Sequence, residues 1–197
     1  MTEENTAAPP ARDVPAALGY LGNPAVASKW DGRYAARQQM WSGLPNGALV
    51  DEVAALTPGR VLDVGCGEGA DAIWLAGLGW AATGLEVSGV ALQRAAEHAR
   101  TAGIAVSWDH AGLAEARLSP SSFDLVSAMY PVLLSTPDAA AERALLSAVA
   151  PGGVLLLVHH AGMQNYKDHD SGFDSADYVW PSMVAALIDD GWQIEAK

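Results

Sequence analysis

Hydrophobic and polar positions along this chain follow two alternating patterns. Short runs of β-branched and other apolar residues are typical of strands that are buried on both faces. Such runs predict strands at residues 60–64, 80–85, 104–108, 123–129, 154–158 and 192–196. Apolar residues at helical spacing predict helices over residues 28–40, 48–56, 70–78, 88–101, 136–150 and 178–190. Because strands that alternate with helices form βαβ crossovers, we predict an α/β fold with a doubly wound, mostly parallel sheet.

The first 27 residues do not share this pattern. Prolines interrupt any helix there, and no apolar period is sustained. We therefore divide the chain into a flexible tail at residues 1–27 and one domain at residues 28–197. Within that domain, we predict a helical region at residues 28–58 and the alternating core at residues 59–197.

Composition narrows the classes of partner. The 197 residues include 11 basic and 23 acidic side chains, a net charge of −12, so the basic footprint of a nucleic-acid binder is missing. No apolar run reaches the ~18 residues of a membrane span, and the N-terminus lacks the features of a secretory signal. The single cysteine, Cys66, excludes a disulfide framework. We expect a cytoplasmic protein with neither nucleic acid nor membrane as partner.

A glycine-rich loop follows the first predicted strand and opens a predicted helix. In this context the loop backbone approaches a ligand closely, and the helix presents unpaired N–H groups to it. Gly65, Gly67 and Ala70 fit a dinucleotide fingerprint, whereas Asp63, Gly65, Gly67 and Gly69 fit an acidic residue followed by G-x-G-x-G. Asp63 favours the second pattern, because a carboxylate at the strand tip suits a cationic amino group better than a pyrophosphate. Its alternative role is to cap nearby loop amides.

The stretch VLDVGCGEGADAIWLAGLGWAATGLEVS resembles the first two motifs of class I S-adenosylmethionine-dependent methyltransferases. The preceding WDGRY and WSG resemble the small bacterial methyltransferases grouped with the tellurite-resistance and thiopurine types. The resemblance spans about residues 28–160. It implies a Rossmann-like fold, S-adenosylmethionine as cofactor with S-adenosylhomocysteine as product, and methyl transfer to an unidentified small molecule.

The resemblance also assigns most of the cofactor pocket. Gly65, Cys66, Gly67 and Gly69 form the loop around the cofactor, although we interpret Cys66 mainly as a small packing residue. Glu86, at the end of the second strand, accepts hydrogen bonds from the ribose hydroxyls.

The adenine and methionine portions complete this expected pocket. Val87 lies against the adenine and Leu113 packs on its ring, while the backbone at Met129 meets the methionine portion. Gly112 stands where the family usually has an aspartate that accepts from the adenine amino group. The amino group must then use a backbone carbonyl or water, and weaker affinity is one consequence.

The helical region at residues 28–58 has an aromatic and basic face. On a helix, Trp30, Arg33, Tyr34 and Arg37 share one side. One interpretation is a lid over the cofactor, in which Arg33 pairs with the cofactor carboxylate. The other is an amphipathic helix packed on the domain, with both arginines in solvent.

Candidate catalytic residues follow the fourth and fifth strands. Tyr130 is a candidate wall of the methyl pocket, and His160 is the histidine expected to line the acceptor side. Adjacent histidines on one strand cannot chelate together, so His159 and His160 indicate no metal site. Two alternative functions stay open. One is an inactive protein that binds S-adenosylmethionine, suggested by Gly112 and Pro131, and the other is an NAD-type oxidoreductase.

The C-terminal pattern ends at the predicted strand 192–196. In the resembled family the sheet has seven strands, and the last inserts antiparallel between the fifth and the sixth. No residues follow here to make it, so we expect that last antiparallel strand to be missing. Three explanations are a fragment of a longer protein, direct pairing of the sixth strand with the fifth, or a poorly ordered C-terminus. We favour the fragment.

Overall fold

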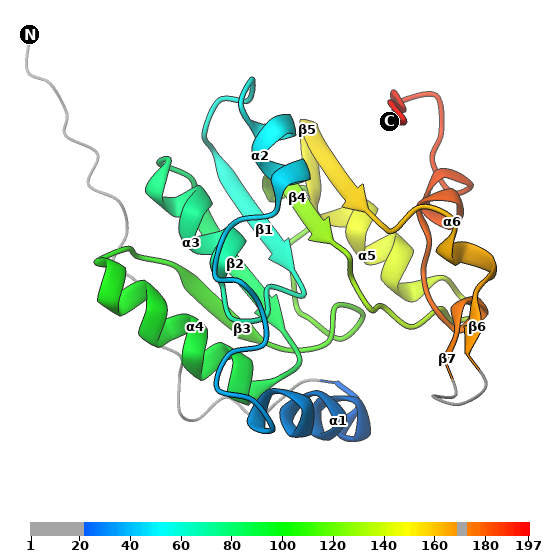
Figure 1. Cartoon of the computed structure of the whole chain (residues 1–197). Helices are drawn as coiled ribbons and strands as arrows, with labels where there is room; N and C mark the ends of the chain where they lie inside the picture. Colours follow the sequence, from blue (N-terminus) through cyan, green and yellow to red (C-terminus); the bar gives the residue numbers. More distant parts are fainter. Residues whose placement is uncertain (1–21, 169–172) are drawn as a thin grey trace, which may run out of the picture.

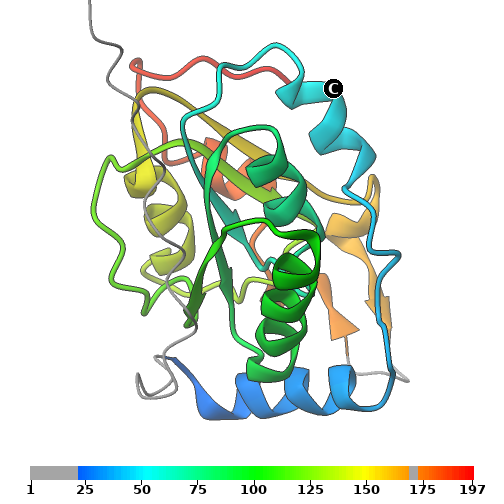
Figure 2. The ribbon, with the colours of Figure 1, turned by 90° about the vertical axis from the view of Figure 1, so that its left-hand side faces the viewer.

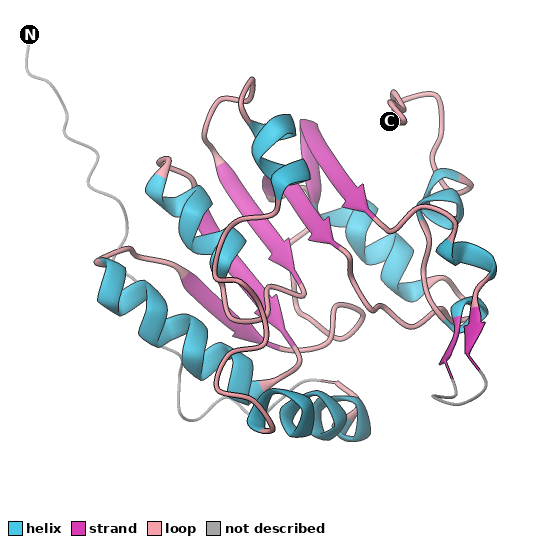
Figure 3. Cartoon of the chain, in the orientation of Figure 1, coloured by secondary structure: helices cyan, strands magenta, loops and turns pink. Residues whose placement is uncertain are grey.

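Five parallel strands form the main sheet of the protein (Figures 1 and 3). The computed structural model describes residues 22–168 and 173–197. The strands are β1 (Arg60–Val64), β2 (Ala81–Glu86), β3 (Ser107–His110), β4 (Phe123–Met129) and β5 (Val149–Val158). Their order is β3-β2-β1-β4-β5, so the order reverses between β1 and β4. The predicted fold class is thus confirmed. Ligands of such sheets bind at the carboxyl ends of the strands, beside this reversal.

Helices cover both faces of this sheet because successive strand residues point to opposite sides. Val61 belongs to one hydrophobic core and Leu62 to the other. The helices α2 (Gly47–Val53), α3 (Ala70–Gly77) and α4 (Gly89–Ala102) pack on the first core, and α5 (Ala140–Ala148) and α6 (Pro181–Ala185) on the second. Val61 and Leu62 are completely buried, and burying such a side chain stabilises the fold by roughly 1.5–3 kcal/mol.

The first helix, α1 (Pro24–Ala35), lies at the carboxyl ends of the strands and beside α4 (Figure 2). The sequence predicted a helix over residues 28–40, and its position was wrong at both ends. Pro24 does not interrupt this helix, because a proline is tolerated in the first turn, where its missing N–H has no helical partner. The side chain of Asn23 caps the start by accepting from the Ala25 amide at 3.0 Å. Helix therefore occupies part of the expected tail, and residues 1–21 lie outside the described residues.

Two other predicted boundaries moved for local reasons. The predicted helix over 136–150 begins at Ala140, because Ala139 has a left-handed φ of 52° and the Thr136 hydroxyl accepts from the Ala140 amide. That helix ends at Ala148, and β5 starts at once. Pro151 fits within β5 because this strand is at the edge of the sheet, where a missing donor is tolerated.

The predicted final strand at residues 192–196 was wrong. In the described part of the chain, residues 186–197 contain no strand, and the preceding helix α6 has five residues where the sequence predicted 178–190. Among the residues that the structure describes, β5 pairs only with β4, so residues 192–196 form no ladder with it. A strand without a neighbour leaves its backbone groups unpaired. Instead, the C-terminus lies beside α2 (Figure 2), where Lys197 pairs with Glu52 at 2.7 Å. A separate two-stranded hairpin joins β6 (Lys167–Asp168) and β7 (Phe173–Asp174).

Candidate functional site

The glycine-rich loop joins β1 to α3 at the carboxyl edge of the sheet. Gly65, Gly67 and Gly69 all have left-handed φ angles, of 71°, 54° and 86°. Side chains rarely adopt this conformation, so the loop needs glycine at these positions. It is tied to the neighbouring strand by the amides of Gly65 and Cys66, which both donate to the carbonyl of Leu85.

Each of these glycines also faces a different neighbour. A Cβ on Gly69 would meet Ala95 and Trp108 at 2.8 Å, so this glycine lets α4 and β3 pack closely. A Cβ on Gly67 would meet the Tyr34 hydroxyl at 2.8 Å. Beside Gly65 a Cβ would meet nothing within 4 Å, so the loop is open on that side. The half-buried Cys66 packs on the first core, and burial raises the pKa of its thiol.

The acidic side chain of Asp63 lies buried beneath this loop. Its side chain is 2% exposed, and within the described residues its Oδ2 atom has no hydrogen-bond partner. Burial, together with the nearby Asp71, raises the pKa of Asp63 well above its usual range. A buried carboxylate oxygen without a donor is costly, and a ligand that donates there removes the cost.

Glu86 ends β2 on the other side of the loop. Its carboxylate accepts from the Gly67 amide at 3.1 Å and from the Ser88 amide at 2.8 Å. Burial raises the pKa of Glu86, and these amide donors partly offset that rise. Each carboxylate oxygen accepts one of these bonds and retains further acceptor capacity for hydroxyl donors. The half-buried Val87 follows at once.

Three acidic side chains fasten residues 24–46, hereafter the N-terminal segment, to this edge. Asp31 accepts from the Ser88 hydroxyl at 2.6 Å and from the Val90 amide at 3.1 Å. Glu68, inside the glycine loop, accepts from the Trp41 amide at 3.2 Å. Asp71, on α3, accepts from both the backbone and the side chain of Asn46 at 2.7 Å.

Arg94 on α4 also joins the N-terminal segment to the glycine loop. Its guanidinium donates to Glu68 at 2.8 Å and to the carbonyls of Tyr34 and Arg37 at 3.0 and 2.7 Å. Burial pushes the pKa of Glu68 up, but the hydrogen bonds from Arg94 and the Trp41 and Met40 amides outweigh it, and the pKa lies below its usual value. Glu68 and Arg94 were missed by sequence reasoning. A charged residue between the glycines of the loop was the signal for Glu68, and α4 gave none for Arg94.

The aromatic and basic residues of α1 lie in two different environments. Tyr34 is buried over the glycine loop and accepts a hydrogen bond from the Trp41 indole at 3.1 Å. Burial first, and then the charge of Glu86, raise the pKa of Tyr34. Arg33 is exposed, with its guanidinium 4.6 Å from the ring centroid of Trp30. The segment therefore packs on the loop, and Arg33 lies on its outer side against an aromatic ring.

The edge beyond β3 holds the predicted adenine side. The Ala111 amide donates to the Glu86 carbonyl at 3.2 Å, so this connection starts directly beside Glu86. Gly112 and Leu113 are buried, and Leu113 packs in the second core.

The ends of β4 and β5 bring Tyr130 and His160 together. Their rings stack with centroids 4.4 Å apart and planes 25° from parallel. Tyr130 has a left-handed φ of 50°, and its amide donates to the Val158 carbonyl at 2.8 Å. Such a strained conformation in a non-glycine residue is concentrated at functional sites. Both side chains are exposed, while Met129 before Tyr130 is half-buried.

His159 points away from this pair. Its ring lies 4.5 Å from that of Trp180, and burial, followed by the nearby His160, lowers its pKa. The segment that carries Trp180 is fixed to the connection after β4, since the Val179 amide donates to the Leu133 carbonyl at 2.9 Å. The two histidines, which follow the end of β5, thus pack against different aromatic rings.

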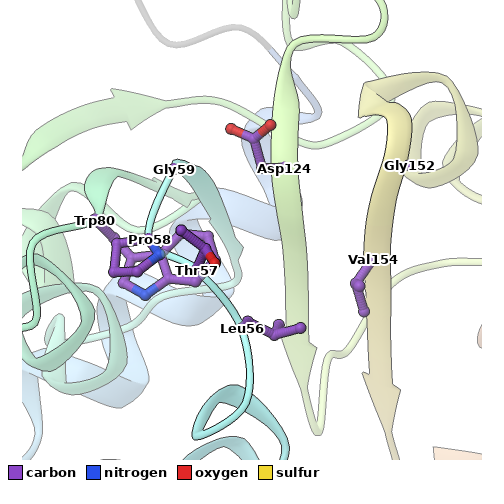
Figure 4. A pocket seen from close by; sticks show the side chains of 8 residues that line it. All are labelled: Leu56, Thr57, Pro58, Gly59, Trp80, Asp124, Gly152 and Val154. Atoms are coloured by element: carbon purple, nitrogen blue, oxygen red, sulfur yellow. The ribbon is translucent and has the colours of Figure 1, made fainter.

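A cavity of about 360 Å³ lies at the opposite, amino-terminal end of the sheet (Figure 4). It is lined by Leu56, Thr57, Pro58, Gly59, Trp80, Asp124, Gly152 and Val154. None of the predicted site residues lines it. In open α/β sheets the conserved place for ligands is the other end, so we assign no function to this cavity.

Comparisons with known proteins show which family the chain is similar to. Residues 61–153 match a family described as methyltransferase domain. The ubiquinone biosynthesis O-methyltransferase of Ralstonia nicotianae is 39% identical over 106 residues, which cover 53% of this chain and 44% of that protein. The enzyme of the same name from Thiobacillus denitrificans is 37% identical, with 53% and 45% covered. The chain thus spans less than half the length of these curated relatives.

Solved structures give the same result. A structure described for the conversion of a disulfide bond into a thioacetal group during echinomycin biosynthesis is 33% identical, with a TM-score of 0.58. That match covers 66% of this chain and 58% of the other. Over residues 61–153 the chain is thus similar to methyltransferase domains, and its mostly parallel sheet has the class I, Rossmann-like fold. Phosphoethanolamine N-methyltransferase 2 of Haemonchus contortus, solved with S-adenosylhomocysteine, is 26% identical over 57% of this chain and 28% of that one, at a TM-score of 0.51.

The residues at this edge fit S-adenosylmethionine, the cofactor of the methyltransferases that the chain resembles. The partnerless buried oxygen of Asp63 suits an ammonium donor, the open side of Gly65 leaves room for a ligand, and Glu86 has acceptor capacity for hydroxyl groups. The finer expectation of a tellurite-resistance or thiopurine type stays a prediction. None of the described helices is long and apolar enough to span a membrane.

Proposed function

We propose that this chain binds S-adenosylmethionine and transfers its methyl group to a small-molecule acceptor. The observation that carries the proposal is the buried, partnerless Asp63 oxygen beneath a left-handed glycine loop that is flanked by Glu86. The net charge of −12 supports a small molecule over a nucleic acid as acceptor.

The chain's own residues have separate tasks in this proposal. Asp63 holds the amino group, Glu86 the ribose hydroxyls, and Val87 and Leu113 the adenine faces, while the loop from Gly65 to Gly69 and the backbone at Met129 enclose the methionine portion. Arg33 would have to turn from Trp30 to reach the cofactor carboxylate. When bound, the sulfonium supplies an activated methyl group for in-line displacement.

The acceptor is proposed to lie beside Tyr130 and His160. Tyr130 orients the acceptor, and His160 takes the proton from an oxygen or nitrogen nucleophile. Because the acceptor contributes the nucleophile, the protein's main tasks are alignment and exclusion of water, and the N-terminal segment over the loop supports the second. A His160→Gln substitution is expected to lower turnover and leave cofactor binding intact, with Gln93→Ala at an exposed position on α4 as the control.

A cofactor-binding protein without catalysis is the second candidate. The stacked Tyr130 and His160 rings favour it, because an acceptor has to displace or flank this pair. A thermal-shift comparison of S-adenosylhomocysteine with NAD tests the shared binding step. A ligand at 100 times its dissociation constant adds about 2.7 kcal/mol to stability. We expect a shift with S-adenosylhomocysteine alone. A shift with NAD alone would overturn both candidates in favour of an oxidoreductase.

A further inference from the structure

The backbone conformation at position 112 does not require glycine. Its φ is not among the left-handed values found in this chain, so any residue type can adopt its backbone. The first obstacle to a side chain there is Glu115, since a Cβ on Gly112 would collide with the Glu115 Oε2 atom. The Glu115 carboxylate therefore occupies the space that a side chain at position 112 would fill.

A tight turn holds Glu115 in this place. The amides of Glu115 and Ala116 both donate to the Gly112 carbonyl, at 3.2 and 2.8 Å. The turn brings position 115 back over position 112. It also uses both acceptor directions of the Gly112 carbonyl, so a ligand amino group arriving there meets a carboxylate and not a vacant carbonyl.

The location is next to the ribose-binding candidate. His110, the last residue of β3, is the register partner of Glu86, and the Ala111 amide donates to the Glu86 carbonyl. Position 112 follows directly. Glu115 is exposed, and within the described residues its carboxylate has no hydrogen bond or ion pair. An exposed acceptor is thus available at the edge where the adenine is expected.

We propose that Glu115 recognises the adenine of S-adenosylmethionine by accepting a hydrogen bond from its exocyclic amino group. Glu115 then supplies, from three residues further along the chain, the acceptor that is missing at Gly112. The inference rests on the proposed function, because it needs the cofactor bound at this edge. It predicts selectivity for a 6-amino purine, since a 6-oxo purine turns an acceptor oxygen toward the carboxylate.

Calorimetry with two ligands tests this proposal. The ligands are S-adenosylhomocysteine and S-inosylhomocysteine, which carries a carbonyl oxygen in place of the amino group. The unmodified chain is expected to prefer the first by tenfold or more, because a hydrogen bond to a charged acceptor has about that effect. Glu115→Ala is expected to weaken S-adenosylhomocysteine about tenfold and to leave the inosyl ligand unchanged or slightly tighter. Glu195→Ala, which removes an exposed carboxylate near the C-terminus, is the control and is expected to change neither.

A second pair of variants keeps the test independent of folding defects. Gly112→Asp combined with Glu115→Ala places the carboxylate on position 112 and is expected to restore the preference for the adenosyl ligand. Far-UV circular dichroism verifies that each variant is folded. Equal affinity of Glu115→Ala and the unmodified chain for S-adenosylhomocysteine, or equal losses for both ligands, would overturn the role of Glu115 alone. If the unmodified chain binds neither ligand, the proposed function fails and this inference fails with it.

Discussion

The Asp31 carboxylate accepts a 2.6 Å hydrogen bond from the hydroxyl of Ser88, 57 residues further along the chain. Ser88 caps α4 and lies two residues after Glu86, so this bond joins the N-terminal segment to the expected ribose site. Asp31 also accepts from the Val90 amide in the first turn of α4, where a negative charge is favourable. Asp31 is thus one of the side chains that join the N-terminal segment to the edge that carries Glu86.

Asp31→Ala is expected to loosen α1 selectively. Loss of these two hydrogen bonds costs about 1–3 kcal/mol of local stability, which speeds amide exchange in α1 while amides of β1 stay protected. Hydrogen exchange measured by mass spectrometry gives this comparison. Lys29→Ala, an exposed position on the same helix, is the control. Unchanged exchange in α1 would show that other contacts hold the helix.

Arg94→Met is expected to destabilise the fold by about 2–4 kcal/mol at neutral pH, because it leaves the buried Glu68 charge without its cation. The folded-state pKa of Glu68 is lowered, so its stabilising contribution is present above the unfolded value near 4.3 and is lost as the pH falls. Chemical denaturation at a series of pH values measures the difference between variant and unmodified chain. That difference should shrink at acidic pH, and a constant difference would argue against the ion pair as its source.

Asp63→Asn is expected to stabilise the unliganded protein at neutral pH. Burial raises the folded-state pKa of Asp63, so the native state holds its proton more tightly than the unfolded chain does. The charge penalty is therefore absent below the unfolded value near 3.9 and grows as the pH rises through the interval up to the folded pKa. Melting temperatures of variant and unmodified chain should diverge as the pH rises from about 4. The same variant should bind S-adenosylhomocysteine more weakly, and a stabilised variant with undiminished binding would remove Asp63 from the site.

Arg33→Ala separates two roles of an exposed arginine. If Arg33 leaves Trp30 to pair with the cofactor carboxylate, the variant should weaken S-adenosylhomocysteine and barely affect methylthioadenosine, which lacks that carboxylate. Calorimetry with both ligands gives the ratio. Equal losses would mean that Arg33 acts only through its packing on Trp30.

Local patterns predicted the centre of the fold and the arrangement of the candidate site. The strand 60–64, the three glycines and the position of Glu86 follow from residues adjacent in sequence, and the structure places them together. The start of α1 was missed because Pro24 was interpreted as a helix breaker, whereas Asn23 caps a helix that begins there. The strand at 192–196 was predicted from its apolar pattern, but a strand also needs a neighbour, and in the structure these residues do not pair with β5.

Contacts between distant segments were beyond sequence reasoning. The pairing of Glu68 with Arg94 spans 26 residues and depends on how α4 packs beside the loop. Glu115 lies over Gly112 because of a turn held by backbone hydrogen bonds. The residue types in this stretch do not predict that turn. Gly112 was recognised as a departure from the family pattern, yet the residue that fills its space appeared only in the structure.

The central claim is that the edge formed by the glycine loop and Glu86 binds S-adenosylmethionine. Calorimetric titration with S-adenosylhomocysteine tests it most directly, using the unmodified chain, Glu86→Ala, and Glu97→Ala as an exposed control on α4. The account predicts one site per chain, affinity lowered tenfold or more in Glu86→Ala by the loss of hydrogen bonds to a charged acceptor, and no change in Glu97→Ala. Binding that is absent from the unmodified chain, or that is equally tight in Glu86→Ala, would contradict it.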